Sequence, residues 1–249
     1  MRNRNMKYTY LAYRNFKEIL RDPLSLILGV LLPVFFILLF SAISRNAPID
    51  VFKPENIVPG ITIFGFTFIT MFLGLLIAKD KSSSLLTRLF ISPLRPKDYI
   101  IGYFVPMLPF SFIIAVVCMS MGLITGIPVS LGLLFTLISF IPYVLFSIFI
   151  GIFLGIICNE TQIMAVGNIY IIASAILGGA WMDTNILGKN MKSITEILPF
   201  SHAIEASRIV LSERHDKIGV HVLIVSVYML LFFFLSVYFF NRKMKSDHI

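Results

Sequence analysis

The sequence predicts an all-α integral membrane protein with six transmembrane helices, on three observations. Of the 249 residues, 57% are hydrophobic and 14% are charged, whereas a soluble domain carries about 25% charged residues. Mean hydropathy is +0.89. The stretch Tyr99–Asn159 contains no Asp, Glu, Lys, Arg or His. As one helix it would measure about 90 Å against a hydrocarbon core of about 30 Å, so it must form two spans.

The six spans follow from a sliding window of about 19 residues. Their approximate limits are 24–44, 57–78, 99–125, 131–157, 161–182 and 219–240. Between the third and fourth spans, TGIPVS (Thr125–Ser130) supplies the turn, because glycine ends helices cheaply and proline does not continue one. We expect one membrane domain over residues 1–249, in which residues 1–23 form a cytoplasmic amphipathic helix, 24–240 the spans and 241–249 a cytoplasmic tail.

Most of the 21 Lys and Arg residues fall in three segments: before the first span, between the second and third, and after the sixth. Positive residues resist translocation, so these segments are predicted on the cytoplasmic side of the cell (plasma) membrane, with both termini inside. The net charge of +8 then belongs to the cytoplasmic face. Anionic membrane lipid or an acidic protein partner fits this charge better than nucleic acid does.

The segment before the first span, YTYLAYRNFKEILRDP, interleaves apolar and charged residues at helical spacing. Tyr13 and Phe16 belong to the aromatic and aliphatic half, whereas Arg14 and Lys17 belong to the charged half. This pattern predicts an amphipathic helix that lies in the membrane interface, and the Asp-Pro pair at 22–23 turns the chain into the first span. An ordinary basic segment flanking the membrane is the alternative interpretation.

A basic segment that contains two prolines follows the second span. RLFISPLRPKDYIIG, residues 88–102, combines cationic side chains with two prolines. Its charge alone predicts a positive-inside anchor. Charge does not explain the order Ser-Pro-Leu-Arg-Pro, however. We expect a short helix that ends at Ser92, followed by a chain that restarts at the third span.

The connection between the fifth and sixth spans is too long for a simple turn. Within it, PFSHAIEASRIVLSE has helical spacing, and Pro199 suits the first turn of a helix. We expect a short helix on the outer side, lying at the interface or dipping partly into the membrane. Gly178 and Gly179, at the outer end of the fifth span, favour close helix packing over a break in the helix.

The residues of this chain predict no catalytic, cofactor-binding or metal-binding site. Charged side chains deep in a membrane usually do ion or proton work, and the predicted spans contain essentially none. The sequence lacks the phosphate-binding GxxxxGK[ST] pattern. His202, Glu205 and His215 have a spacing that a solvated helix face gives by chance, so we do not expect zinc there. Cys118 and Cys158 are interpreted as small core residues.

Taken in order, these features resemble the ABC-2 type transporter permeases, which are membrane subunits of ABC exporters. The loop KDKSSSLLTRLFISPLRPKDYIIGYF and the later segments GGAWMD and ITEILPFSHAIEASR carry the resemblance. The matching positions are Leu86, Arg88, Leu89, Ser92, Pro93, Leu94, Gly102, Gly178, Gly179, Pro199, Ala203 and Arg208. The chain departs from the family pattern at Ser84-Leu85, where Gly-Thr is usual, and at Asp80, which is the only acid where the family usually carries two or more.

The resemblance implies that two permeases, identical or homologous, form the pathway and that two ABC ATP-binding subunits grip short cytoplasmic helices. Residues 82–93 would be the coupling helix and the amino-terminal helix a second contact, while ATP and magnesium would bind the partner subunit. The implied coupling residues are Arg88, Leu89, Ser92, Pro93, Leu94 and Arg95.

The expected function is ATP-driven export of an apolar or amphipathic substrate, such as a drug, antibiotic, peptide or lipid, because the spans offer a pathway without charges. Two alternatives remain open. One is an accessory or immunity protein that binds a substrate without moving it. The other is a six-span intramembrane enzyme, for which polar side chains would have to meet at depth, and the spans offer mainly Ser, Thr, Tyr and Asn168.

Overall fold

The computed structural model describes the chain except for residues 1–5, 47–49, 84–95, 183–187, 214–217 and 247–249. Its described part is helical and contains no strand. Six helices are long and apolar enough to cross a membrane, which confirms the predicted fold class. These spans are Ile27–Asn46, Pro54–Ser82, Lys97–Thr125, Leu131–Ile157, Glu160–Leu177 and Ile218–Lys243.

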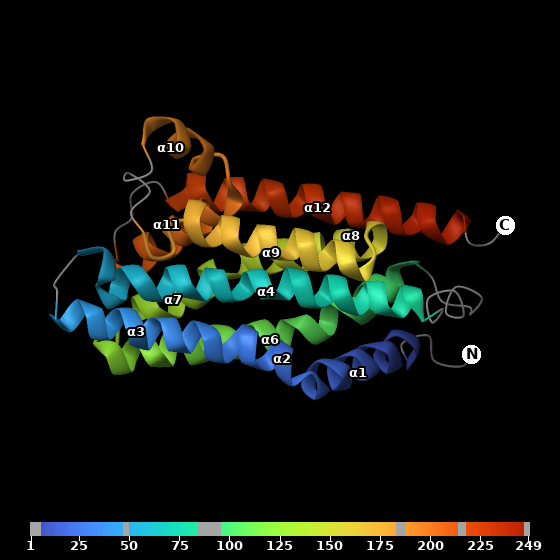
Figure 1. The fold of residues 1–249 in the computed structure, drawn as a ribbon, viewed down its shortest axis with the longest axis horizontal. Helices are drawn as coiled ribbons and strands as arrows, with labels where there is room; N and C mark the ends of the chain where they lie inside the picture. The colour runs from blue at the N-terminus through green and yellow to red at the C-terminus, as the bar shows by residue number, and fades with distance from the viewer. Residues whose placement is uncertain (1–5, 47–49, 84–95, 183–187, 214–217, 247–249) are drawn as a thin grey trace.

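The described helices follow one another as α1 (Met6–Arg21), α2 (Pro23–Leu26), the π-helical turn η1 (Ile27–Leu31), α3 (Leu32–Asn46), the 3₁₀ turn η2 (Asp50–Phe52), α4 (Pro54–Ser82), α6 (Pro96–Thr125), α7 (Leu131–Ser139), α8 (Ile141–Ile157), α9 (Glu160–Leu177), α10 (Lys189–Thr195), α11 (Pro199–Leu211) and α12 (Ile218–Ser246). The spans run side by side along the long axis of the molecule (Figure 1).

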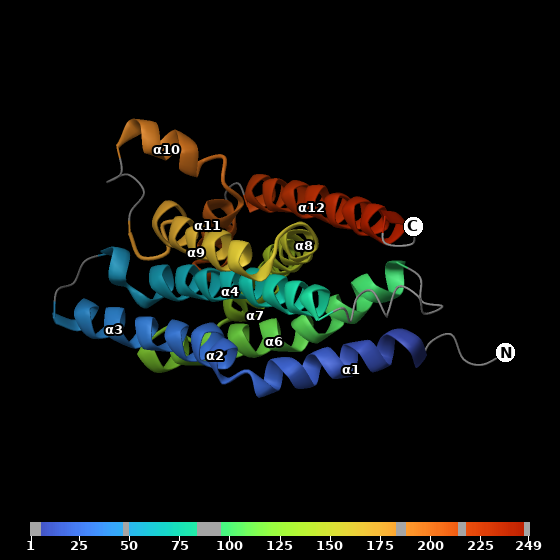
Figure 2. The ribbon, with the colours of Figure 1, turned by 45° about the vertical axis from the view of Figure 1, so that its right-hand side comes forward.

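The two ends of the bundle differ. One end, which we call the basic end after Arg14, Lys79 and Arg242, holds α1 and the last turns of α4 and α12 (Figure 1). At the opposite end lie η2, α10 and α11. In Figure 2 as in Figure 1, α1 extends beyond α2 toward the basic end, roughly along the long axis of the bundle. The predicted helix before the first span is therefore present, and its placement in the membrane interface stays a prediction.

Helix α4 forms the centre of the bundle. Every residue from Ile57 to Ala78 is buried except Met71 and Leu75, which are half-buried. Helices α3, α6, α8, α9 and α11 all pack against it. Small residues allow the closest of these approaches, because a Cβ at Gly155 of α8 would lie 2.7 Å from the Cβ of Ile77.

Helix α12 packs mainly on α8 through pairs of aromatic rings. Phe149 and Phe233 have ring centroids 5.0 Å apart, and Phe146 and Phe232 are 5.5 Å apart, both edge-to-face. Much of the remaining surface of α12, and of α3 and α9, consists of exposed apolar side chains. This distribution is typical of helices that face lipid.

The turns follow from glycine and proline. Helix α6 ends at Thr125, and Gly126 follows with a φ of +123°, as the TGIPVS turn predicts. Helix α9 ends at Leu177, earlier than the predicted limit of 182, because Gly178 caps it and Gly179 adopts a φ of +71°. The glycine pair therefore ends the helix. It also packs closely, because a Cβ at Gly178 would lie 3.2 Å from the side chains of Phe200 and Ile204.

At the opposite end, α11 links α4 to the end of α9. Arg208 donates hydrogen bonds from Nε to the carbonyl of Asn56 and from Nη2 to the carbonyl of Gly179, both at 2.8 Å. Gly60 of α4 lies so close to the same turn that a Cβ there would be 2.4 Å from the carbonyl oxygen of Ala180. The predicted helix before the sixth span is thus present as α11. Through Arg208 it is joined to the first turn of α4 and to the turn after α9.

Candidate functional site

The last turn of α4 directs three consecutive charged residues to three different partners. Lys79 points outward, with its Nζ 3.8 Å from Glu18 of α1. Asp80 is buried, with a side chain 1% exposed. Lys81 donates from Nζ to the carbonyls that end α8. The predicted coupling helix, residues 82–93, begins at the end of this turn, so these contacts lie directly before most of it in the sequence.

Asp80 forms the centre of a buried polar cluster. Arg14 of α1 binds both of its carboxylate oxygens, at 2.5 and 2.7 Å, and the hydroxyl of Tyr103 of α6 donates to it at 2.7 Å. A planar guanidinium on a carboxylate is the strongest of the common side-chain pairs. The hydrogen bond to Asp80 and the charge of that carboxylate raise the pKa of the Arg14 guanidinium. A second carboxylate, Glu18, lies 2.6 Å from Arg14.

The next residue of α1, Asn15, binds the backbone of α6. Its side chain is fully buried and donates from Nδ2 to the carbonyl of Gly102 at 3.0 Å. That carbonyl is open to a side chain because Pro106, four residues later, has no N–H to donate back to it. A proline inside α6 therefore creates the acceptor that Asn15 uses.

Gly102 also allows the two helices to approach. A Cβ at this position would lie 2.6 Å from Cδ2 of Leu11, whose side chain is buried against α6. We call this cluster the α1 anchor. Its members are Leu11, Arg14, Asn15, Asp80, Gly102 and Tyr103. Helix α1 is thus held by an ion pair, a hydrogen bond and a close apolar contact.

Lys81 holds the end of α8. Its Nζ lies 2.5 Å from the carbonyl of Cys158, 3.1 Å from that of Ile156 and 3.3 Å from that of Gly155. These groups are left without partners when a helix ends, and a cation there also complements the helix dipole. The last turn of α4 therefore fixes the end of the fourth span as well as α1.

A cavity of about 960 Å³ lies at the basic end between α1, α4 and the start of α9. The residues lining it are Tyr13, Arg14, Lys17, Glu18, Ile19, Arg21, Asp22, Pro23, Phe72, Leu75, Leu76, Lys79 and Glu160. One part of this lining is apolar and the rest carries charges of both signs. We call it the basic-end cavity.

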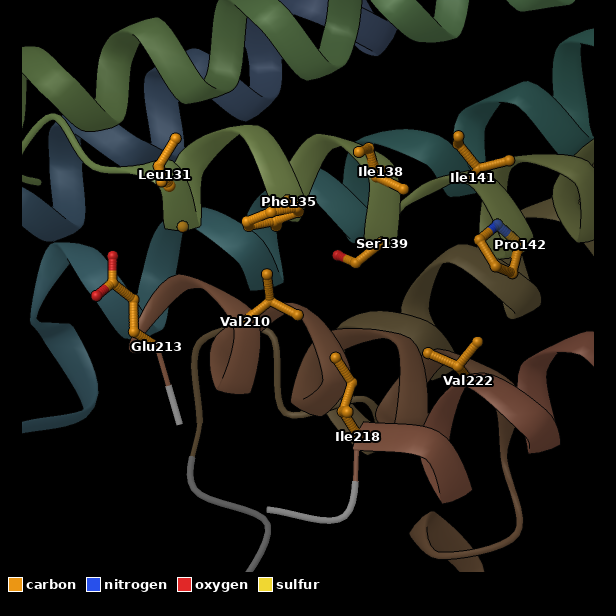
Figure 3. A pocket seen from close by; sticks show the side chains of 11 residues that line it. Leu131, Phe135, Ile138, Ser139, Ile141, Pro142, Val210, Glu213, Ile218 and Val222 are labelled. Carbon is orange, nitrogen blue, oxygen red and sulfur yellow. The ribbon is translucent and has the colours of Figure 1, made fainter. Parts of the chain in front are cut away.

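A second cavity, of about 800 Å³, lies toward the opposite end (Figure 3). Leu131, Phe135 and Ile138 of α7 face Val210 of α11 and Val222 of α12 across it. Its lining is mostly apolar and contains no cationic side chain among the described residues. An apolar space of this kind gives a polar ligand little to fix its orientation.

The structure describes the predicted residues of the amino-terminal helix but not the predicted coupling residues. Arg14 is in the α1 anchor, and Lys17 lies over the ring of the exposed Tyr13, 4.5 Å from its centroid. Phe16 is half-buried on α1. The predicted coupling residues lie outside the described residues, so their arrangement stays a prediction. They are Arg88, Leu89, Ser92, Pro93, Leu94 and Arg95.

Polar side chains do meet within the spans, as a six-span intramembrane enzyme would require. The hydroxyls of Tyr143 and Tyr170 are 3.2 Å apart, and Thr70 donates to the carbonyl of Ser147 at 3.0 Å. No His, Cys, Asp or Glu takes part in these two contacts, and no group of three such residues that could hold a metal occurs in the described chain. The cluster joins α4, α8 and α9.

His202, one of the candidate zinc ligands, has a different environment from the one predicted. Its Nε2 donates to the carbonyl of Glu196 at 2.7 Å, and its Nδ1 lies 2.8 Å from Nδ1 of His221 on α12. A separation of 2.8 Å is that of a direct hydrogen bond between the rings. His215 lies outside the described residues.

The comparison with known sequences fits this arrangement of helices. The sequence model of the family described as ABC-2 type transporter matches residues 6–212. The chain belongs to the ABC-2 type transporter family. It is also similar to a protein of Cyanophora paradoxa that is named as a transport permease, ycf38. The two are 27% identical over 218 residues, which cover 81% of this chain and 73% of the relative.

Membership of the ABC-2 type transporter family makes the chain the membrane subunit of a transport permease. The matched region begins at the first residue of α1 and ends one residue after α11, so it includes the whole α1 anchor and the contacts of Arg208. The last span, α12, lies beyond it.

Sequence reasoning named Arg14, Asp80 and Gly102 separately but missed that they meet, with Leu11, Asn15 and Tyr103, in the α1 anchor. Two signals were present in the sequence. Asn15 is a polar residue in the apolar stripe of an amphipathic helix, and Pro106 stands four residues after Gly102 in a span. Neither signal identifies a partner, because the contact joins residues 87 positions apart.

We expect the substitution Gly102→Ala to loosen α1 from α6, because the new methyl group would overlap Leu11. Overpacking of this kind costs about 1–3 kcal/mol. Limited proteolysis of the purified chain should then cut within α1 at least severalfold faster than in the unmodified chain. Adding Leu11→Ala should restore resistance, since it removes the overlapping atoms. An unchanged cleavage rate in Gly102→Ala would show that α1 does not depend on this close approach.

Proposed function

We propose that this chain is the transmembrane subunit of an ATP-driven ABC exporter and works with a separate ATP-binding subunit. The substrate is an apolar or amphipathic molecule, and a second permease copy or a homologous permease completes the pathway. ATP and magnesium bind the partner subunit, because these 249 residues contain no phosphate-binding GxxxxGK[ST] pattern. Membership of the ABC-2 type transporter family supports this proposal.

The observation that carries the proposal is the set of contacts at the end of α4. Asp80 holds α1 and α6, while Lys81 holds the end of α8. Both residues precede residues 82–93, the predicted coupling helix, which we propose as the contact with the ATP-binding subunit. A force applied to that helix would reach several spans at once, because the spans are joined where it begins.

Orientation follows from charge. The structure gathers α1 and the end of α12 at the basic end of the bundle (Figure 1). Positive residues resist translocation. We therefore propose that the basic end, with both termini, faces the cytoplasm and that the protein resides in the cell membrane. This orientation gives an ATP-binding subunit access to the loop after α4.

Co-purification tests this function. The tagged chain, extracted from its native membrane in mild detergent, should bring down an ATP-binding protein. Charge reversal of the loop with Arg88→Glu and Arg95→Glu should reduce recovery of that protein by about tenfold, because two favourable charge contacts become repulsive.

A matched control carries the same change of charge at a different place. Arg242→Glu and Lys243→Glu alter exposed residues of α12 at the basic end and should leave recovery within about twofold. Equal recovery with the loop variant and the unmodified chain would overturn the coupling role of the loop. If no ATP-binding protein is recovered with any variant, the exporter assignment is wrong.

A further inference from the structure

We propose that α9 is the contact surface for a second copy of this chain and that Asn168 of each copy hydrogen-bonds Asn168 of the other across a twofold axis. A polar side chain on the uncovered side of a span carries this inference. The identity of the partner as a second permease rests on the proposed function. The need of Asn168 for a partner does not.

Helix α9 packs on the bundle with one side only. Ile163, Gly167 and Ile171 are buried on that side, where a Cβ at Gly167 would lie 2.9 Å from Cγ of Met71 of α4. The α9 span is 28% buried, whereas an equally long stretch of α4 is 89% buried. In both views of the ribbon α9 lies at the surface of the bundle (Figures 1 and 2). Its other side therefore faces lipid or a partner.

Asn168 lies at the middle of this span. Helix α9 has 18 residues, which span about 27 Å at 1.5 Å per residue, close to the thickness of about 30 Å of a hydrocarbon core. Its middle residue therefore lies near the centre of the bilayer. The side chain of Asn168 is exposed, and within the part of the chain that the structure describes it has no hydrogen-bond partner.

A carboxamide at this depth has polar groups that hydrocarbon cannot satisfy. Asn168 presents two N–H donors and a carbonyl acceptor, and leaving such groups unpaired in an apolar medium is costly. A bond to its own helix, such as the one that Asn46 makes to the carbonyl of Ala42 at 3.1 Å, would use one N–H and leave the other groups unpaired. Polar side chains within spans therefore usually face another helix.

Asn168 belongs to a row of exposed side chains that suits the packing of two helices. The row runs along α9 in steps of three and four residues, so its members lie on one side of the helix. These members, which we call the α9 seam, are Thr161, Ala165, Asn168, Ile172 and Ile176. Their spacing is that of the seam in a left-handed helix pair, and the small Thr161 and Ala165 let two backbones approach. One asparagine in an apolar seam also fixes the register of the pair.

A second copy of the chain is the partner that satisfies Asn168. A twofold axis along the membrane normal leaves depth unchanged, so Asn168 of the second copy lies at the same depth as Asn168 of the first. Because a carboxamide is both donor and acceptor, each of the two side chains can donate to the other. Hydrocarbon tails supply neither group, and an unrelated membrane protein would need a polar residue of its own at that depth.

Förster transfer between copies tests the contact without any ATP-binding subunit. Purified chains that carry a donor or an acceptor on a carboxy-terminal tag are mixed in phosphatidylcholine liposomes over a range of protein-to-lipid ratios. Asn168→Leu should raise the apparent dissociation constant of the dimer about tenfold, because the hydrogen bonds between the amides are lost. Asn168→Gln keeps the carboxamide and should stay within about threefold. Ser120→Leu removes an exposed polar side chain from α6 and should leave the constant unchanged.

Disulfide cross-linking locates the contact. In a chain whose half-buried Cys158 has been changed to serine, Ala165→Cys should give a cross-linked dimer under mild oxidation, because this position lies about one turn from Asn168 in the α9 seam. Leu230→Cys is the matched control. Its side chain is 48% exposed near the middle of α12, and this variant should not cross-link. The fully buried Cys118 should not react.

The outcomes separate the interface from the exporter function. Equal dissociation constants for the unmodified chain and Asn168→Leu would overturn the contact. Absence of transfer at every ratio would mean that lipid covers α9, and a disulfide in Leu230→Cys without one in Ala165→Cys would move the interface to α12; either result refutes the proposal. A chain that recovers an ATP-binding protein but fails these tests keeps the exporter function. A dimer that depends on Asn168, in a chain that recovers no ATP-binding protein, keeps the interface and refutes that function.

Discussion

Replacing Arg14 with leucine is expected to destabilise the protein by about 3–5 kcal/mol, because the substitution leaves the carboxylate of Asp80 buried without its cation. Asp80 is 1% exposed, and it would keep the hydrogen bond from the hydroxyl of Tyr103. Thermal unfolding in detergent measures the loss. The fully buried Cys118 reports it through a thiol-reactive fluorophore, once Cys158 has been changed to serine.

The reverse substitution should cost less. In Asp80→Leu, Arg14 keeps Glu18 at 2.6 Å and a side chain that is 37% exposed, so the guanidinium retains an anion and water. The double variant Arg14→Leu/Asp80→Leu should melt at a higher temperature than Arg14→Leu alone, because no buried charge remains. A double variant whose loss equals the sum of the two single losses would mean that the residues do not interact.

Replacing Gly60 with alanine should produce the second large effect, a loss of about 3 kcal/mol at the opposite end of the bundle. The new methyl group would meet the backbone of the turn after α9, with the carbonyl oxygen of Ala180 at 2.4 Å and its Cα at 2.9 Å. A backbone segment cannot move aside as a side chain can, and Arg208 already holds this turn to α4.

Gly219→Ala is the matched control. This glycine lies in the first turn of α12, where an added Cβ would have no neighbouring atom within 4 Å, so alanine there should be neutral or slightly stabilising. The same melting assay compares the two variants. If Gly60→Ala and Gly219→Ala melt at the same temperature, the close approach of α4 to the turn does not support the fold.

Arg14→Leu and Gly60→Ala affect contacts at the two ends of one helix, α4. At the basic end α4 is joined to α1, α6 and α8 through Asp80 and Lys81, and at the opposite end it is joined to α9 and α11 through Gly60 and Arg208. A helix that is fixed at both ends and buried between them moves as a unit. In the proposed exporter, α4 is therefore the element that would carry a displacement of the loop across the membrane.

The charge pattern of the sequence leaves the role of the α4 terminus open. Between Lys79 and Lys81, Asp80 has the appearance of one loop residue in a basic segment. The structure extends the helix to Ser82, which gives three neighbouring side chains three directions around its axis. Asp80 then points inward, and its partners come from residues 66 positions before it and 23 after it.

The sequence by itself determined the fold class, the six spans, the amphipathic first helix and the family, because hydropathy and short motifs are local properties that a single chain displays. Only the tertiary structure decided which polar residues meet. Asn15 and Pro106 are ordinary features of their own helices until α1 lies on α6, where the carbonyl that the proline leaves open becomes the acceptor for the amide. Contacts of this kind depend on how helices pack, and packing is a property of the whole bundle that no local pattern encodes.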